Sequence, residues 1–306
     1  MRIVMPVLLV LGGLGPGVGT AQAKLPAPPE AAALEAQQAW RKSPVAPRRL
    51  VGPVHYVGTA GAGVFLITTP QGHLLVDSGF PDTVAAVAAG IEELGFKVED
   101  IRWLLTTAGR VDRAGGLAEL KRMSGAQVVS SRAERRLLES GGKEDFQPGP
   151  PELLHFPAVA VDRMVADAER VSHGGVTLTA QLTPGPTRGS TTWTMEAEEG
   201  GRNYAVVFAC DLSLAPGARL KVQPSHPEIM REYDQAFVRL KGLGADIYFT
   251  PQPGQWGMAA KFSRLDAGAG AEALEDKDGW RSYVALAEYA YRKQIRDEEA
   301  EAKGGR

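Results

Sequence analysis

The chain has 306 residues, with 34 Lys or Arg against 36 Asp or Glu, so its formal net charge is −2. It therefore lacks the basic surplus typical of nucleic-acid-binding proteins and the acidic runs typical of disordered chains. Hydrophobic residues make up 44% and charged residues 23%, as in an ordinary globular protein of one large domain or two small ones.

The N-terminal segment has the pattern of a secretory signal. Arg2 supplies a positive start, residues 3–11 are apolar, and Ala21-Gln22-Ala23 is a small-X-small cleavage site. We expect a signal peptide over 1–23 and cleavage before Lys24, which would place the mature protein in the periplasm or outside the cell. The alternative is a membrane anchor, but the apolar run is too short to span a bilayer, so no stable membrane insertion is expected.

After this segment, residues 24–50 are rich in Pro and Ala and are predicted to form an N-terminal arm. Residues 51–306 are predicted to form the main domain. Cys210 is the only cysteine in the sequence, so an internal disulfide is excluded. Because Cys210 follows the apolar run AVVFA, we predict a buried and unreactive thiol.

In chain order, the first half of the domain alternates apolar strands with helices of 3.6-residue periodicity. The helix predicted over 83–94 is stopped by Gly95. The other predicted elements are strands over 55–59, 63–69, 73–79, 101–107 and 126–131 and a helix over 116–123.

The second half repeats this alternation of strands and helices. Its predicted elements are strands over 176–185, 190–198, 203–211 and 245–252 and helices over 227–240 and 280–296. The charged residues 298–306 are expected to form a frayed end. Two such halves, packed sheet to sheet, predict an α/β fold with four layers in the order αββα.

Residues 104–116 read LLTTAGRVDRAGG. This segment resembles the zinc motif of the metallo-β-lactamase superfamily, in which an apolar strand is followed by Thr-His-X-His-X-Asp-His and then Ala-Gly-Gly. Thr107, Asp112, Ala114 and Gly115-Gly116 match that pattern. The phrases YVGTAGAGVFLITTPQGHLLVDSG, GLAELKRMSGAQVVSS, TPGPTRGSTTWTM and ADIYFTPQPG are similar, in order and spacing, to the third subclass of class B β-lactamases. The resemblance covers roughly Trp40 to the terminal helix and implies the metallo-β-lactamase fold.

The resemblance also implies two zinc ions, five histidine ligands and zinc-dependent β-lactam hydrolysis. Carried over residue by residue, the positions of the first zinc are Ala108, Arg110 and Pro186, and those of the second are Asp112, Arg113 and Gln252. Only Asp112 is retained as a ligand of the family.

These six positions do not supply a zinc site. Alanine and proline have no side-chain donor, and a guanidinium offers only N–H groups and repels a cation, whereas zinc needs about four N, S or O ligands. No two of the remaining histidines have the spacing of a ligand pair; they are His55, His73, His155, His173 and His226. We therefore expect no metal cofactor and assign no catalytic residue.

Losing the metal would leave the carboxylate of Asp112 without a compensating charge. We expect Arg110 or Arg113 to pair with Asp112 or with Asp77, which matches an aspartate that lies beneath the metal site in the superfamily. The other guanidinium is a candidate anion-binding group.

Three functional interpretations follow. The first is an exported pseudoenzyme or binding protein whose ligand is a small anionic or β-lactam-like molecule. The second is a hydrolase that keeps weak activity through an atypical site, for example one metal ion held by Asp112, Gln252 and water. The third is a protein without a selected role, which a single sequence does not distinguish from the first.

Overall fold

The computed structural model describes residues 39–43, 45–147, 149–214 and 217–304, which belong to one compact unit running from residue 38 to 306. The signal peptide predicted over 1–23 lies outside the described residues, as does the arm up to residue 38. None of the helices in the described part of the chain combines the length and the hydrophobicity that crossing a bilayer requires.

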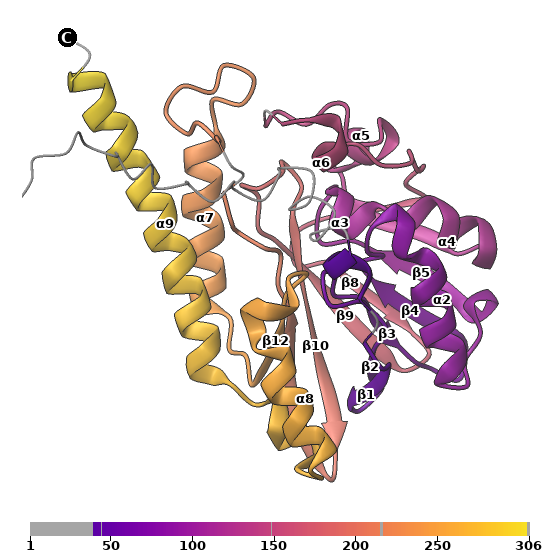
Figure 1. Ribbon diagram of the computed structural model, residues 1–306. Coiled ribbons are helices and arrows are strands. Elements are labelled where there is room, and N and C mark those ends of the chain that lie inside the picture. Colours follow the sequence, from indigo (N-terminus) through magenta and orange to yellow (C-terminus); the bar gives the residue numbers. More distant parts are fainter. Residues whose placement is uncertain (1–38, 44, 148, 215–216, 305–306) are drawn as a thin grey trace, which may run out of the picture. The chain divides into compact units, whose positions relative to one another are not determined.

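Within the described residues the strands form two sheets (Figure 1). In the first, β1 to β4 are antiparallel neighbours, whereas β4 to β7 run parallel. In sheet order its strands are β1 (Arg48–Val51), β2 (Val54–Tyr56), β3 (Phe65–Ile67), β4 (His73–Val76), β5 (Ile101–Leu105), β6 (Gln127–Ser131) and β7 (Arg163–Val165).

The second sheet is antiparallel except for the pairing of β11 with β12. In sheet order its strands are β12 (Ile247–Phe249), β11 (Arg202–Phe208), β10 (Thr191–Glu199), β9 (Val176–Leu182) and β8 (Arg170–His173).

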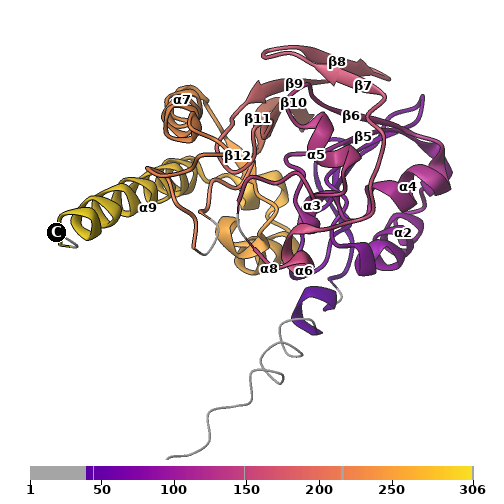
Figure 2. The same ribbon diagram turned by 90° about the horizontal axis from the view of Figure 1, so that it is seen from above.

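Helices cover the outer face of each sheet, α2 and α4 on the first and α7 and α9 on the second (Figures 1 and 2). The α-helices are α2 (Val84–Glu93), α3 (Val111–Ala114), α4 (Leu117–Ser124), α5 (Arg135–Glu139), α6 (Pro151–Leu154), α7 (Ile229–Gly242), α8 (Met258–Asp266) and α9 (Lys277–Gly304). Short 3₁₀ turns are η1 (Pro81–Thr83), η2 (Val98–Asp100), η3 (Pro253–Trp256) and η4 (Gly270–Leu274).

The two sheets meet through an aromatic core. The ring of Phe65 on β3 lies 4.9 Å from that of Phe249 on β12 and 5.2 Å from that of Phe208 on β11. Outside the second sheet, Tyr233 of α7 stacks on Tyr291 of α9 with their centroids 5.1 Å apart. Burying these large side chains stabilises the packing of the layers. The predicted four-layer sandwich is confirmed.

The predicted helices and strands are present, apart from their exact ends and two differences, whereas β7, β8, α3, α5, α6 and α8 were not predicted. The first difference is at the domain start. β1 begins at Arg48, inside the range predicted for the arm, and pairs with β2 through Arg48 and Tyr56.

The end of helix α2 at Gly95 agrees with the prediction. Gly95 has φ +84°, a value that glycine adopts without strain, and its N–H donates to the carbonyl of Glu92, as expected of a glycine that ends a helix.

The second difference is at the charged end, which the sequence predicted to be frayed. Helix α9 instead continues to Gly304. Glu298 is only 6% exposed, and its carboxylate accepts hydrogen bonds from the backbone N–H groups of Leu220 and Lys221 at 2.9 Å each. The prediction was wrong because one carboxylate in this run, that of Glu298, is buried and accepts hydrogen bonds from a loop far away in the sequence.

Replacing Glu298 with alanine should lower the free energy of unfolding by about 1–3 kcal/mol, because two backbone N–H groups would lose their acceptor. Glu301→Ala is the matched control. Glu301 pairs with Arg219 in solvent, and we expect its loss to cost less than about 1 kcal/mol. Urea unfolding of both variants tests this, and equal losses would contradict the capping role.

Candidate functional site

The loops that carry the positions of interest meet at one edge of the sandwich. In the first sheet, β4, β5 and β6 run parallel, so the segments that follow them leave at the same edge. Asp77, Thr107 and Glu134 lie in those segments. In the second sheet, Pro186, Asp211 and Gln252 come after β9, β11 and β12, which point in one direction.

Hydrogen bonds from the start of β10 join the two edges. The N–H of Thr191 donates to the carbonyl of Thr107 at 2.8 Å, and the indole N–H of Trp193 donates to the carbonyl of Thr106 at 3.1 Å. The loops of both sheets are thereby held around a common site.

Asp77 lies beneath this site and organises the loop after β5. Its carboxyl group accepts hydrogen bonds from the backbone N–H of Thr107 at 2.7 Å, from the Thr107 hydroxyl at 2.8 Å and from the Thr106 hydroxyl at 3.2 Å. Asp77 has φ +59°, in the left-handed region that side chains rarely adopt. Burial raises the pKa of Asp77 to about 7, although the hydrogen bond from Thr107 opposes the shift.

Arg113 is the buried cation at the centre of the site. Its Nη2 lies 3.3 Å from Oδ2 of Asp211, and its Nε lies 3.7 Å from Oδ2 of Asp112. The side chain of Arg113 is 6% exposed. Burial lowers the pKa of Arg113, but Asp112, Asp211 and Asp77 hold it above its ordinary value, so the guanidinium stays charged. The expected pairing of an arginine with Asp112 is present.

Asp112 and Gln252 meet across the two sheets. The Nε2 of Gln252 donates to Oδ2 of Asp112 at 2.9 Å. These two residues are therefore side by side, although they are 140 residues apart in the sequence. The resemblance assigns both positions to the same metal ion. They form a carboxylate–amide hydrogen bond, and Arg113 lies against the same oxygen.

Arg110 joins a second group of loops. Its Nη1 lies 3.0 Å from Oδ2 of Asp145, and its Nη2 donates to the carbonyl of Pro186. The Nε2 of Gln147 donates to the same carbonyl at 3.0 Å. Ala108 is fully buried. Arg110 and Arg113 thus both lie beside carboxylates. Anion binding by these two arginines stays a prediction, and the neighbouring carboxylates do not favour it.

Glu134 belongs to the site but was not identified in the sequence. Its buried carboxylate accepts hydrogen bonds from the N–H groups of Gly109 and Gly189 and from the hydroxyl of Thr187. A Cβ at Gly189 would lie 2.3 Å from the backbone nitrogen of Glu134, so only glycine fits there. Burial raises the pKa of Glu134. Glu134 lies in the run SRAERR, which has the composition of an exposed helix and gives no signal of this role.

In the described part of the chain, His, Cys, Asp and Glu side chains form no group of three or more that could hold a metal ion. Cys210 is fully buried, and burial raises the pKa of its thiol to about 12, as expected of an unreactive cysteine.

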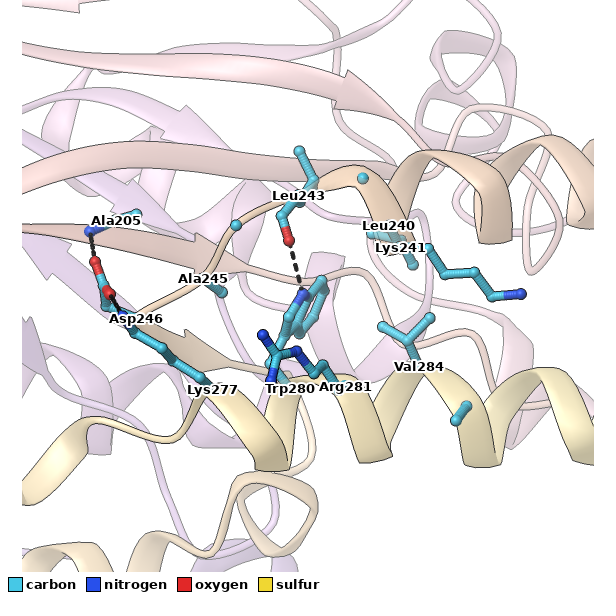
Figure 3. Close-up of a pocket in the computed structure, with 13 residues that line it drawn as sticks. Ala205, Leu240, Lys241, Leu243, Ala245, Asp246, Lys277, Trp280, Arg281 and Val284 are labelled. Atoms are coloured by element: carbon cyan, nitrogen blue, oxygen red, sulfur yellow. Dashed lines mark hydrogen bonds and ion pairs between the residues drawn. The ribbon is translucent and has the colours of Figure 1, made fainter.

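A separate hollow of about 570 Å³ lies between the end of α7 and the start of α9 (Figure 3). Its main polar groups are paired with one another. The indole N–H of Trp280 donates to the carbonyl of Leu243 at 3.1 Å, and Lys277 lies 2.9 Å from Asp246, which also accepts the N–H of Ala205. These contacts hold α9 against the second sheet, so the residues around this hollow have a structural role.

Comparison with solved structures gives close matches over most of the chain. A metallo-β-lactamase with an HARLDQ motif from Cronobacter sakazakii is 36% identical with a TM-score of 0.80, and covers 86% of this chain and 98% of its own. BJP-1, a subclass B3 metallo-β-lactamase of Bradyrhizobium japonicum, is 34% identical with a TM-score of 0.81, and covers 87% and 99%. Native FEZ-1 from Legionella gormanii is 31% identical with a TM-score of 0.81, and covers 84% and 98%.

The sequence model described as the metallo-beta-lactamase superfamily matches residues 61–252, a range that includes Asp77, Arg113 and Gln252. Together with the αββα sandwich and the structural matches, this shows that the chain belongs to the metallo-β-lactamase superfamily.

Proposed function

We propose that this protein is an exported binding protein that uses the metallo-β-lactamase fold without zinc and without β-lactam hydrolysis. The observation that carries the proposal is the position of Arg113. Its buried guanidinium lies between Asp112 and Asp211, where the resemblance places the second zinc ion.

The residues at the site do not fit two zinc ions. Ala108 and Pro186 bring no side-chain donor, and the carbonyl of Pro186 already accepts hydrogen bonds from Arg110 and Gln147. Asp112 is the retained ligand, but a cation and an amide N–H group already face one of its oxygens. A metal ion there would meet the positive charge of Arg113 and would lack ligands.

The Cronobacter relative bears on the alternative function. The six letters of its HARLDQ motif and the residues AGRVDR at 108–113 share Arg in third place and Asp in fifth. That relative is named a metallo-β-lactamase, so a protein of this name can have an arginine at the third place of the motif. This favours a metal-dependent hydrolase of weak activity as the second candidate. The relative, however, keeps a histidine where this chain has Ala108.

Metal analysis and nitrocefin turnover of the purified protein test the proposal. We expect well under one zinc per chain and no turnover, because one of six ligands is retained. Stoichiometric zinc, together with activity that a chelator abolishes, would establish the alternative function instead.

Restoring the histidines should recover zinc binding, because the backbone that positions them is kept. The variant carries five substitutions, Ala108→His, Arg110→His, Arg113→His, Pro186→His and Gln252→His. We expect it to bind zinc, as measured by elemental analysis after dialysis. The matched control is Arg113→His alone, which leaves too few donors and should bind none. Stoichiometric zinc in the single variant would count against this account of the site.

Export is the remaining part of the proposal, supported by the tripartite pattern of residues 1–23. N-terminal sequencing of the protein recovered from the periplasm or medium should begin at Lys24. Recovery with Met1, or only with membranes, would contradict export.

A further inference from the structure

An opening of about 500 Å³ lies beside the Arg113 cluster, where the loops after β11 and β12 meet the helical turn at 39–42. The residues that line it are Trp40, Asp211, Ser213, Gln252, Gly254 and Gln255. It therefore combines one aromatic wall with a polar floor.

The turn that carries Trp40 is anchored by contacts of Arg41, although Trp40 itself is 49% exposed. The carbonyl of Arg41 accepts the hydroxyl of Thr59 at 2.6 Å, and the guanidinium of Arg41 lies 3.6 Å from the centroid of Phe80. The indole lies close against Gly61, where an added Cβ would come within 3.3 Å of the ring. An exposed tryptophan on an anchored turn is a preformed contact surface.

The side-chain donors that line the opening point toward carboxylates. The Nε2 of Gln252 donates to Asp112 at 2.9 Å, that of Gln255 donates to Asp211 at 3.2 Å, and the hydroxyl of Ser213 donates to Asp211 at 2.6 Å. The carboxylates fix both amides with their nitrogens inward, because the reverse orientation would place two oxygens against each other.

The same amides also present oxygen acceptors. The Oε1 of Gln255 is buried and has no hydrogen-bond partner among the described residues. For the Oε1 of Gln252, the described residues likewise provide no donor within hydrogen-bonding distance. A ligand that complements this floor brings N–H or O–H groups.

The charge around the floor is negative. Asp112 and Asp211 carry two negative charges, and Arg113 supplies one positive charge between them. The neighbouring cation Arg110 is paired with Asp145, and Arg41 lies 3.9 Å from Asp82. Negative charge beneath an exposed indole favours a cation, which an aromatic face also attracts.

We propose that this opening binds a small organic ammonium ion. Its N–H groups donate to the free oxygen of Gln252, which lines the opening, and its charge lies over the ring of Trp40 and near the carboxylate of Asp211. The inference rests on the proposed function in one respect, that no zinc occupies the site. It replaces the anionic ligand expected from the sequence with one of opposite charge.

Four small probes of similar size separate the contributions to binding. They are butylammonium, butan-1-ol as the neutral probe, butanoate as the anion, and tetramethylammonium as a cation without N–H groups. The indole N–H signal of Trp40 in ¹H–¹⁵N NMR spectra reports binding, and its absence in Trp40→Leu assigns it. We expect butylammonium to bind at least about tenfold more tightly than butan-1-ol, and tetramethylammonium to fall between them.

Trp40→Leu should weaken butylammonium binding about 2- to 30-fold, read from the ligand by saturation-transfer NMR. Tyr289→Leu is the matched control, an aromatic residue of α9 that is 61% exposed, and it should leave the affinity unchanged. Butanoate binding as tightly as butylammonium, or equal affinities of the wild type and Trp40→Leu, would overturn the proposal.

Zinc content is measured on the same sample, which keeps the two proposals distinguishable. Zinc-free, inactive protein that does not bind butylammonium would refute the ammonium site alone. Stoichiometric zinc with nitrocefin turnover would refute the proposed function, whatever the probes do.

Discussion

Replacing Arg113 with alanine is expected to lower the free energy of unfolding by about 3–5 kcal/mol, the range found when one partner of a buried ion pair is removed. The side chains of Asp112 and Asp211 are only 13% and 8% exposed, and both would lose the cation between them. Urea unfolding followed by circular dichroism measures the loss.

The matched control is Arg122→Ala. Arg122 pairs with Glu119 on the surface of α4, where its side chain is 70% exposed, and its removal should cost less than about 1 kcal/mol. If Arg113→Ala cost no more than this control, Arg113 would not be the compensating charge of the site. Arg113→Lys should lie between the two, because a point charge replaces the guanidinium fork.

Asp77→Ala should be the second large effect, with a loss of about 2–4 kcal/mol. The buried N–H of Thr107 would lose its acceptor, which costs about 1–3 kcal/mol, and alanine at φ +59° adds about 1 kcal/mol more. Asp77→Asn is the control. Asparagine tolerates this φ and keeps an oxygen for Thr107, so we expect a smaller loss. Equal losses in both variants would show that neither the acceptor nor the backbone conformation matters.

The same pair of proteins tests the titration of Asp77. Because burial raises its pKa from 3.8 to about 7, the folded protein keeps the proton at pH values where the unfolded chain has released it. The stability that Asp77 contributes is therefore lost as the pH rises from about 4 to 7. Asn does not titrate, so the stability of Asp77→Asn relative to the wild type should increase over that interval. A constant difference would show that Asp77 has an ordinary pKa.

The layered fold could be predicted because its signals are local. Period-two strands, helical periodicity and the stop at Gly95 each depend on neighbouring residues. The pattern around Thr107, Asp112 and Gly115-Gly116 also located the loop of the site. The ion pairs of the site were only partly predictable. The pairing of an arginine with Asp112 follows from charge balance. The pairing of Arg113 with Asp211 does not, because the two residues are 98 positions apart and no spacing connects them.

The residues that sequence reasoning missed share one property: they are polar groups whose burial depends on distant partners. Glu134 lies in a charged run that resembles a solvent-exposed helix, and so does Glu298. Each is buried because backbone N–H groups from other loops converge on its carboxylate. Trp40 is a different case, an exposed aromatic residue in the range predicted as an arm, and no local pattern connects it with Gln255.

The position of Arg113 also constrains how this lineage can change. A single substitution back to histidine removes the charge that balances two acids and supplies one of several missing ligands. Under the proposed function, we expect such a chain to be less stable than its parent and to gain no metal in return. A zinc site would then have to be regained through several substitutions made together, because each one alone would remove a compensating charge or add too few ligands. In that case Arg113 would act as an evolutionary ratchet.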